Sequence, residues 1–116
     1  MIDYCKEVCG ALQQVLPTYY ELALTSGTKT PCYSYQEANN IDTDTGDTIG
    51  YSRISFYVKT WANNISLIQQ YSAEADKVMK KLGFKRTSTN TLHDNNSAMI
   101  QKISTYEALA LEEIGG

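Results

Sequence analysis

The stretch TIGYSRISFYVKTW, residues 48–61, decides the fold, because its apolar and polar side chains alternate over most of its length. In an extended strand, successive side chains point to opposite faces of the sheet. Ile54, Phe56 and Val58 therefore share one face. The opposite face carries Tyr51, Arg53, Ser55, Tyr57, Lys59 and Trp61. The pattern predicts a long strand with one buried face and a second face that is too aromatic for plain contact with solvent.

Two amphipathic helices are predicted, one before this strand in the sequence and one after it. The segment before Pro17 repeats apolar residues at spacings of three and four, and its stripe consists of Ile2, Cys5, Cys9, Leu12 and Leu16. A second helix is expected from Ile65 to Leu82, with Asn63 or Asn64 as its N-cap and Gly83 after its end. Its stripe consists of Ile68, Tyr71, Ala75, Val78, Met79 and Leu82. The two stripes indicate that both helices pack on one face of a sheet.

Four further segments are predicted as strands, and they are residues 18–24, 32–37, 84–90 and 98–111. The polar residues 39–50 are expected to form a solvated hairpin loop. The resulting order is α-β-β-β-α-β-β. It describes a single α+β domain over residues 1–116, with a four- to five-stranded mixed sheet and two helices on one face.

Composition and charge exclude several classes of protein. With 116 residues, 42% of them hydrophobic and 20% charged, the chain has the profile of one globular domain. Its net charge of −3 argues against sequence-specific nucleic-acid binding, which normally needs a basic face. No apolar run approaches the ~20 residues that span a bilayer, so no membrane partner is expected. The three cysteines are an odd count without a secretory signal pattern, and we expect them to be reduced thiols.

An acidic segment has part of the pattern of a calcium-binding loop. Asp42 and Asp44 are spaced as alternating carboxylates that could converge on one cation, but the fifth position of the loop is Gly46 and Asp47 is only the sixth. The twelfth position of such a loop should be a bidentate Glu, but here it is Arg53. We therefore expect no metal site at this segment.

The cysteines and the single histidine could in principle supply the ligands of a structural zinc site. These residues are Cys5, Cys9, Cys32 and His93. Cys5 and Cys9, however, lie one turn apart on the apolar stripe of the first helix, where the core requires them. We expect buried thiols and no bound zinc.

The sequence shows no pattern of catalytic residues. Asp94 adjoins His93, but adjacent residues of an extended chain point in opposite directions and do not form an acid–base pair. No serine has the context of a nucleophile elbow, and no glycine cluster could cradle a phosphate. We expect a protein that is not an enzyme and has no cofactor.

The number and placement of aromatic residues are the most informative feature of the composition. Nine tyrosines and one tryptophan occur, and most of them fall in the first three predicted strands. Tyrosine is enriched where protein surfaces meet, so a sheet with aromatics on its second face favours an assembly protein. The candidate interface consists of Tyr51, Arg53, Tyr57, Lys59 and Trp61, with Asp42, Asp44 and Asp47 on the preceding loop.

The order and spacing of these segments resemble a known family. The chain combines an N-terminal helix ending at Leu16-Pro17, the strand PCYSY at residues 31–35, and the strand YSRISFYVKTW at residues 51–61. A helix containing Ala-Asp-Lys-Val at residues 75–78 and the pair Gly83-Phe84 follow. Over roughly residues 2–112 this series resembles the tail terminator (tail completion) proteins of long-tailed bacteriophages. Each motif is a packing signature and not a chemical one, so the resemblance lies in their arrangement.

The resemblance implies a structural role in a virion. Such proteins form a ring, a hexamer when assembled, on the last ring of the tail tube, stop tube growth and present a surface to the head–tail connector. The implied partners are further copies of this chain, the tail tube protein and the connector protein. The implied location is the head-proximal end of the tail, after assembly in the cytoplasm of the bacterial host. No catalytic or cofactor-binding residue is carried over.

Two alternatives remain open from the sequence. The chain could be another head–tail connector or minor capsid protein, which would share its size and acidity. It could also be a soluble α+β ligand-binding module, which would be a stable monomer with a closed pocket.

Overall fold

The computed structural model describes residues 4–20, 29–44, 49–93 and 99–113. Its elements are α1 (Cys5–Gln13), β1 (Thr18–Tyr20), β2 (Cys32–Asp44), β3 (Ile49–Ala62), α2 (Ile65–Lys81), β4 (Lys85–His93) and β5 (Ile100–Glu113). This is the predicted order, and the α+β class is confirmed. No described helix is long and apolar enough to cross a membrane.

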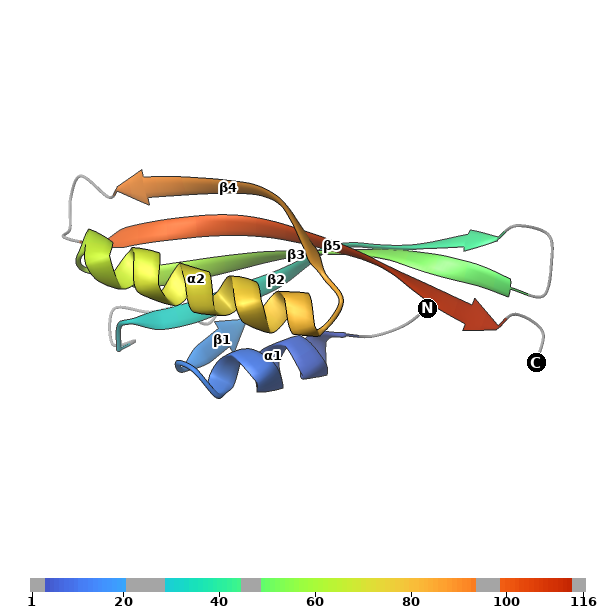
Figure 1. The fold of residues 1–116 in the computed structure, drawn as a ribbon, viewed down its shortest axis with the longest axis horizontal. Helices are drawn as coiled ribbons and strands as arrows, with labels where there is room; N and C mark the ends of the chain where they lie inside the picture. Colours follow the sequence, from blue (N-terminus) through green and yellow to red (C-terminus); the bar gives the residue numbers. More distant parts are fainter. Residues whose placement is uncertain (1–3, 21–28, 45–48, 94–98, 114–116) are drawn as a thin grey trace.

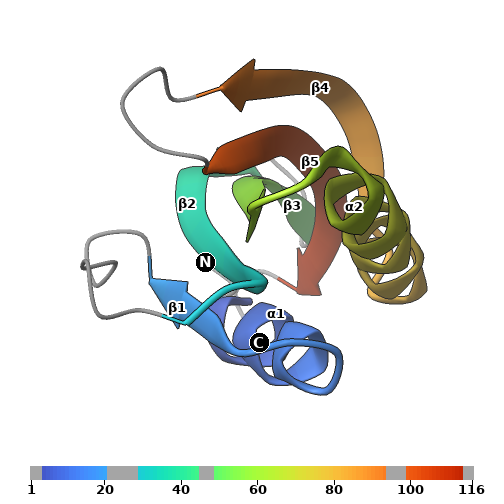
Figure 2. The ribbon, with the colours of Figure 1, turned by 90° about the vertical axis from the view of Figure 1, so that its left-hand side faces the viewer.

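The five strands form one mixed sheet in the order β1-β2-β3-β5-β4. Only β1 and β2 are parallel, and each remaining neighbouring pair is antiparallel. Both helices lie on one side of this strongly twisted sheet, as Figure 2 shows. The opposite side of the sheet carries no helix in the described part of the chain, and we call it the open face.

The molecule is elongated, with principal extents of 52 × 24 × 23 Å. The helices cover the sheet only over part of its length (Figure 1). Beyond them, the end of β2, the start of β3 and the end of β5 continue together as a three-stranded projection. Asp44 of β2 pairs with Gly50 of β3, which in turn pairs with Glu112 of β5.

The core lies between the sheet and the two helices. Ile54, Phe56 and Val58 of β3 are buried, as their alternation predicted. They pack with Val8, Leu12, Leu16, Tyr33, Ala75, Met79, Phe84 and Tyr106. Phe84 packs edge-on against Phe56, with ring centroids 5.6 Å apart. The predicted helix stripes therefore do meet one face of the sheet.

Local chemistry sets the ends of α2. The side chain of Asn64 accepts a hydrogen bond from the backbone N–H of Leu67, at 2.9 Å, which caps the first turn. At the other end, Gly83 has a φ of +96°, a conformation that glycine adopts without steric cost. Phe84 then returns the chain to the core, because its N–H donates to the carbonyl of Met79.

The structure corrects the prediction of a solvated loop at residues 39–50. β2 continues to Asp44, well past the predicted end at residue 37, while β3 begins at Ile49, close to its predicted start, so most of this polar segment is paired backbone. Pairing with β3 supplies the hydrogen bonds of this backbone, so few apolar side chains are needed to extend the strand. Residues 45–48 lie outside the described residues.

Boundaries near the N-terminus also differ from the prediction. α1 ends at Gln13, and the N–H groups of Gln14 and Val15 then donate to the carbonyls three residues earlier, those of Ala11 and Leu12, in a tighter turn before Pro17. Leu16 nevertheless remains buried. β1 ends at Tyr20, and the rest of the strand expected at residues 18–24 lies outside the described residues, as does Ile2 of the first stripe.

Candidate assembly interface on the open sheet face

The alternation of β3 and its register with its neighbours build the open face. Opposite Tyr57 lie Gln36 of β2 and Thr105 of β5, while opposite Lys59 lie Ser34 and Ile103. Side chains directly opposite each other in a sheet share a face. The open face over β3 therefore has aromatic and charged residues on its central strand, with both polar and aliphatic residues beside them.

A hydrogen bond anchors Trp61 to this face. Its indole Nε1 donates to the hydroxyl Oγ of Ser34, at 2.9 Å, although the two residues are 27 positions apart in the chain. Ser34 is fully buried, while Trp61 is half-buried. The indole is thus held across β2 with part of its surface available to a partner.

Lys59 lies beside this tryptophan. Its Nζ is 6.0 Å from the centroid of the Trp61 ring, at the limit of a cation–π contact. Burial lowers the pKa of Lys59 below its usual value, because a partly desolvated ammonium loses hydration. Lys59 and Trp61 therefore form one contiguous amphipathic surface.

Arg53 and Tyr57 are the more exposed members of the candidate interface. Arg53 Nε lies 3.5 Å from Glu107 Oε1, and both side chains remain substantially exposed. Tyr57 is 41% exposed, and Leu109, opposite Arg53, is 61% exposed. Exposed tyrosine, arginine and leucine on a helix-free face are residues that a partner surface could cover.

The other predicted interface residues lie on the projection or beyond the described chain. Tyr51 is on β3, opposite Thr43 and Leu111. Asp42 and Asp44 are on β2, opposite Ser52 and Gly50, and so are not in a loop. Asp47 lies outside the described residues. The structure thus brings Arg53, Tyr57, Lys59 and Trp61 together on one face and places Asp42 and Asp44 toward the far end of the sheet.

The candidate zinc ligands lie on different elements. Cys5 and Cys9 are on α1, whereas Cys32 is on β2 opposite Trp61, and His93 ends β4. The three cysteines form no disulfide with one another, and burial raises the pKa of Cys32 to about 11. Across the described ranges, no group of three or more His, Cys, Asp or Glu residues is placed to hold a metal ion.

Sequence reasoning missed a polar cluster around Asp76 on the helix side. Asp76 accepts a hydrogen bond from the hydroxyl of Tyr106, at 3.1 Å, and pairs with Lys80 at 3.1 Å and Arg86 at 3.6 Å. Burial alone would raise the pKa of Asp76, but its hydrogen bonds from Lys80 and Tyr106 and the charge of Arg86 outweigh burial and lower it. The spacing of Asp76 and Lys80 is the signal that could have found half of this cluster.

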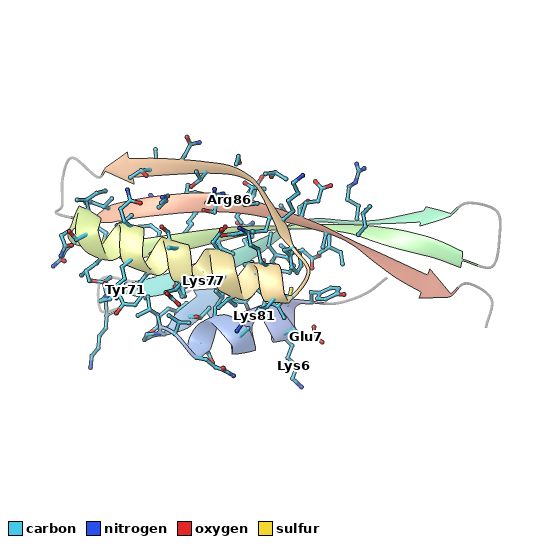
Figure 3. All side chains as sticks on the ribbon, viewed as in Figure 1. Lys6, Glu7, Tyr71, Lys77, Lys81 and Arg86 are labelled. Atoms are coloured by element: carbon cyan, nitrogen blue, oxygen red, sulfur yellow. The ribbon has the colours of Figure 1, made fainter. Side chains whose placement is uncertain are left out.

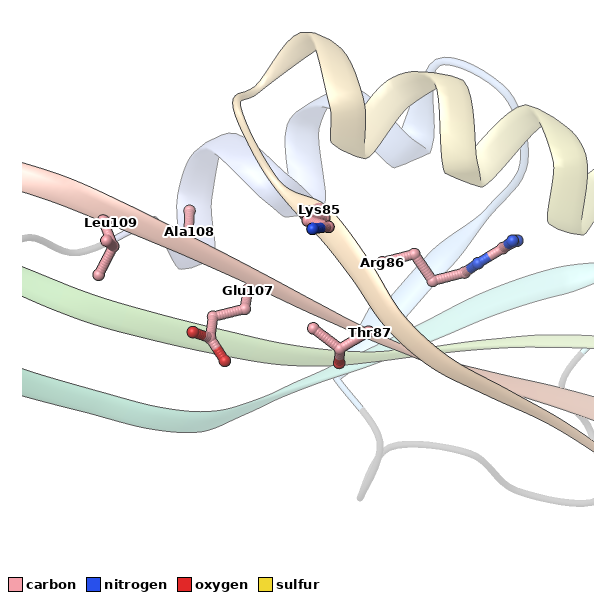
Figure 4. A pocket seen from close by; sticks show the side chains of 6 residues that line it. All are labelled: Lys85, Arg86, Thr87, Glu107, Ala108 and Leu109. Atoms are coloured by element: carbon pink, nitrogen blue, oxygen red, sulfur yellow. The ribbon is translucent and has the colours of Figure 1, made fainter.

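A shallow hollow of about 520 Å³ lies where β4 curves away from β5. It is lined by Lys85, Arg86, Thr87, Glu107, Ala108 and Leu109. Figure 4 shows Arg86 pointing toward α2 and Glu107 pointing to the other side of the sheet, in agreement with their ion-pair partners Asp76 and Arg53. The two charged side chains diverge, so they do not converge on one bound molecule.

Comparison with known proteins shows the fold but not a family. No family model matches the sequence, and the curated proteins contain no match. Among solved structures, this chain is similar to a chain of the structure described as "Virion of native gene transfer agent (GTA) particle". The TM-score is 0.59 at 13% identity, over 90% of this chain and 85% of the other. The similarity shows that the same arrangement of helices and strands occurs in that particle.

Proposed function

We propose that this protein is a structural component of a phage-like virion, and specifically a tail terminator that caps the tail tube as a ring, stops its growth and forms the head–tail joining surface. The observation that carries the proposal is the similarity to a virion chain over nearly the full length of the protein. The open face supports it, because exposed aromatic and arginine side chains there have no covering layer in the described residues. The proposal assigns no catalytic residue and no cofactor.

In this proposal the open face is buried on assembly. The contacting residues are Tyr51, Arg53, Tyr57, Lys59 and Trp61, with Asp42, Asp44 and Asp47 meeting basic residues of a neighbour. A ring closes through heterologous contacts, in which one surface of each subunit meets a different surface of the next. The partners are further copies of this chain, the tail tube protein and the head–tail connector, at the head-proximal end of the tail.

The test is tube length. Tail tubes assembled in vitro from the tube protein of the same phage or prophage should stop growing and carry a terminal cap when this protein is added. Electron microscopy measures both effects. Uncapped tubes of unchanged length would contradict the terminator role.

Two variants and a control locate the interface. Arg53→Ala and Tyr57→Ala should each weaken capping, since truncating an anchor at the centre of an interface typically lowers affinity by about tenfold or more. Lys77→Ala is the matched control, because Lys77 lies on the outer surface of α2, away from the open face (Figure 3). If both open-face variants are folded by circular dichroism and cap like wild type, the open face is not the interface.

The alternatives give different results in the same preparation. Another connector or minor capsid protein would form oligomers that ignore tail tubes. A ligand-binding module would remain monomeric at every concentration and would leave the tubes unchanged.

A further inference from the structure

Several stretches of edge backbone are unpaired in the described part of the chain, and the two longest lie on β4 and β2. β4 pairs only with β5, so the outer side of Lys85–His93 has no strand beside it. Among the described residues, β1 covers β2 from Tyr33 to Tyr35, and residues 36–44 of β2 have β3 as their one partner strand. Each free edge is nine residues long. An uncovered edge presents N–H and C=O groups that another strand can bind.

The two edges have opposite charge. β4 contains Lys85, Arg86 and His93 and no acidic residue. Residues 36–44 of β2 contain Glu37, Asp42 and Asp44 and no basic residue. Lys85 and Arg86 are exposed at the start of β4. Proteins often block edge strands with proline or with charges along their length. Residues 88–92 of β4 contain neither.

We propose that β4 of one subunit adds to residues 36–44 of β2 of a second copy, so that the sheet continues from subunit to subunit; this contact rests on the ring of the proposed function. The occupant is a second copy because each chain carries both the basic and the acidic edge. Such a head-to-tail contact uses two different surfaces and can close into a ring.

Geometry fixes the sense of this pairing. Within one subunit β2 and β5 run in one direction, and β3 and β4 run in the other. A rotation about an axis roughly along the strands preserves these directions, so β4 meets the neighbouring β2 in the antiparallel sense. Full overlap then places Lys85 opposite Asp44 and Thr89 opposite Asn40. The basic start of β4 thus lies beside the acidic end of β2.

The offset along the strands is compatible with ring closure. Within one subunit Lys85 pairs with Glu107, Glu107 pairs with Ser55, and Ser55 pairs with Asn39, so Lys85 and Asn39 lie at the same position along the strands. In the proposed contact Lys85 lies opposite Asp44 of the neighbour, which is five residues further along β2. An offset of five residues at ~3.4 Å each is about 17 Å along the strands. The four strands of one subunit, β2, β3, β5 and β4, span about 19 Å across the sheet. These lengths correspond to a strand tilt of roughly 40°, within the range of about 35–45° seen in closed sheets.

Disulfide trapping tests the contact directly. We would combine Thr89→Cys with Asn40→Cys in one chain, and separately Ser88→Cys with Ile41→Cys, because opposite residues in antiparallel pairs alternate between closer and wider spacing. Two strands separate the paired positions within one subunit, so any disulfide between them joins two copies. Mild oxidation of the concentrated protein should give a ladder of covalent oligomers on a non-reducing gel.

Matched controls keep the result specific. Wild type measures cross-linking through its own three cysteines. Asn40→Cys combined with Lys77→Cys places the second thiol on the outer surface of α2. Lys85→Glu added to the trapping pair should reduce the ladder roughly fivefold, because it puts like charges opposite each other. Asp44→Lys added to that variant should restore it.

The outcomes separate this contact from the proposed function. A ladder no stronger than that of the Lys77→Cys control for both pairs, or a ladder unchanged by Lys85→Glu, would overturn edge pairing. If the protein still caps tubes when edge pairing has been overturned in this way, the proposed terminator role is unaffected. A ladder that responds to both charge changes, together with tubes that are never capped, would support edge pairing and contradict the terminator role.

Discussion

The indole Nε1 of Trp61 donates a hydrogen bond to the buried hydroxyl of Ser34, and this 2.9 Å contact joins the end of β3 to the start of β2. It orients the one tryptophan of the chain on the open face. Because the contact links an exposed surface to a buried atom, it makes the shape of the candidate interface depend on the packing of β2.

The first prediction concerns this hydrogen bond. Ser34→Ala should lower the free energy of unfolding by about 1 kcal/mol, because the indole N–H loses its partner. Urea unfolding followed by far-UV circular dichroism measures the change. Ser72→Ala is the control, since the Ser72 hydroxyl contacts a carbonyl of its own helix at 3.3 Å. Equal effects of the two substitutions would show that the Trp61 contact does not stabilise the sheet.

The second prediction concerns the core. Leu12 is fully buried between α1 and the sheet, and Leu12→Ala should cost about 2–5 kcal/mol through lost transfer energy and the cavity left behind. Leu109→Ala removes the same atoms from a residue that is 61% exposed, and it should change stability by less than about 0.5 kcal/mol. A denaturant titration of both variants measures the difference. A loss at Leu12 as small as that at Leu109 would contradict the packing described here.

The third prediction concerns pH. The folded-state pKa of Asp76 lies below its usual value of 3.8, so ionised Asp76 contributes stability above that pH. This contribution is lost as the pH falls through the folded-state pKa. Asp76→Asn should therefore be less stable than wild type at neutral pH, and the gap should close at acidic pH below 3.8.

Thermal unfolding at a series of pH values tests the role of Asp76. Glu74→Gln is the control, because Glu74 pairs only with the exposed Lys77 among the ion pairs found in the described residues. A gap between wild type and Asp76→Asn that stays constant from neutral to acidic pH would show that Asp76 does not act through its charge.

The fourth prediction concerns thiol reactivity. Burial raises the pKa of Cys32 to about 11, so at pH 8 its thiolate should be on the order of a hundredfold less populated than that of an ordinary cysteine. Reaction of the native protein with a thiol reagent should show a slow phase that Cys32→Ser removes. Rapid reaction of all three cysteines in the folded protein would contradict the burial of β2.

The fifth prediction concerns calcium. Asp42 and Asp44 belong to a paired strand, and Arg53 occupies the position where a calcium loop needs a bidentate Glu. Calorimetric titration with calcium should therefore give no saturable binding. A site of micromolar affinity would overturn the prediction, and Asp42→Asn would show whether this segment provides it.

The sequence by itself determined the elements whose signal is local. The alternation of Ile54, Phe56 and Val58 identified the buried face of β3, because a strand has a side-chain period of two. The pair Asn63-Asn64 and Gly83 marked the ends of α2, because an N-cap and a C-terminal glycine each satisfy a local requirement of the helix backbone, and the structure assigns the N-cap to Asn64. The residues that share the open face with Tyr57 followed from the same period.

Only the tertiary structure decided the features that depend on pairing between distant segments. The polar residues up to Asp44 become strand because β3 supplies their hydrogen bonds, which no local propensity encodes. β5 lies between β3 and β4, and this order leaves the outer edge of β4 without a partner strand among the described residues. The cluster of Asp76 with Tyr106 and Arg86 forms because α2 crosses the sheet at that point. Local pattern therefore fixed which residues face the core, and long-range pairing fixed which described edges stay unpaired and which polar groups meet.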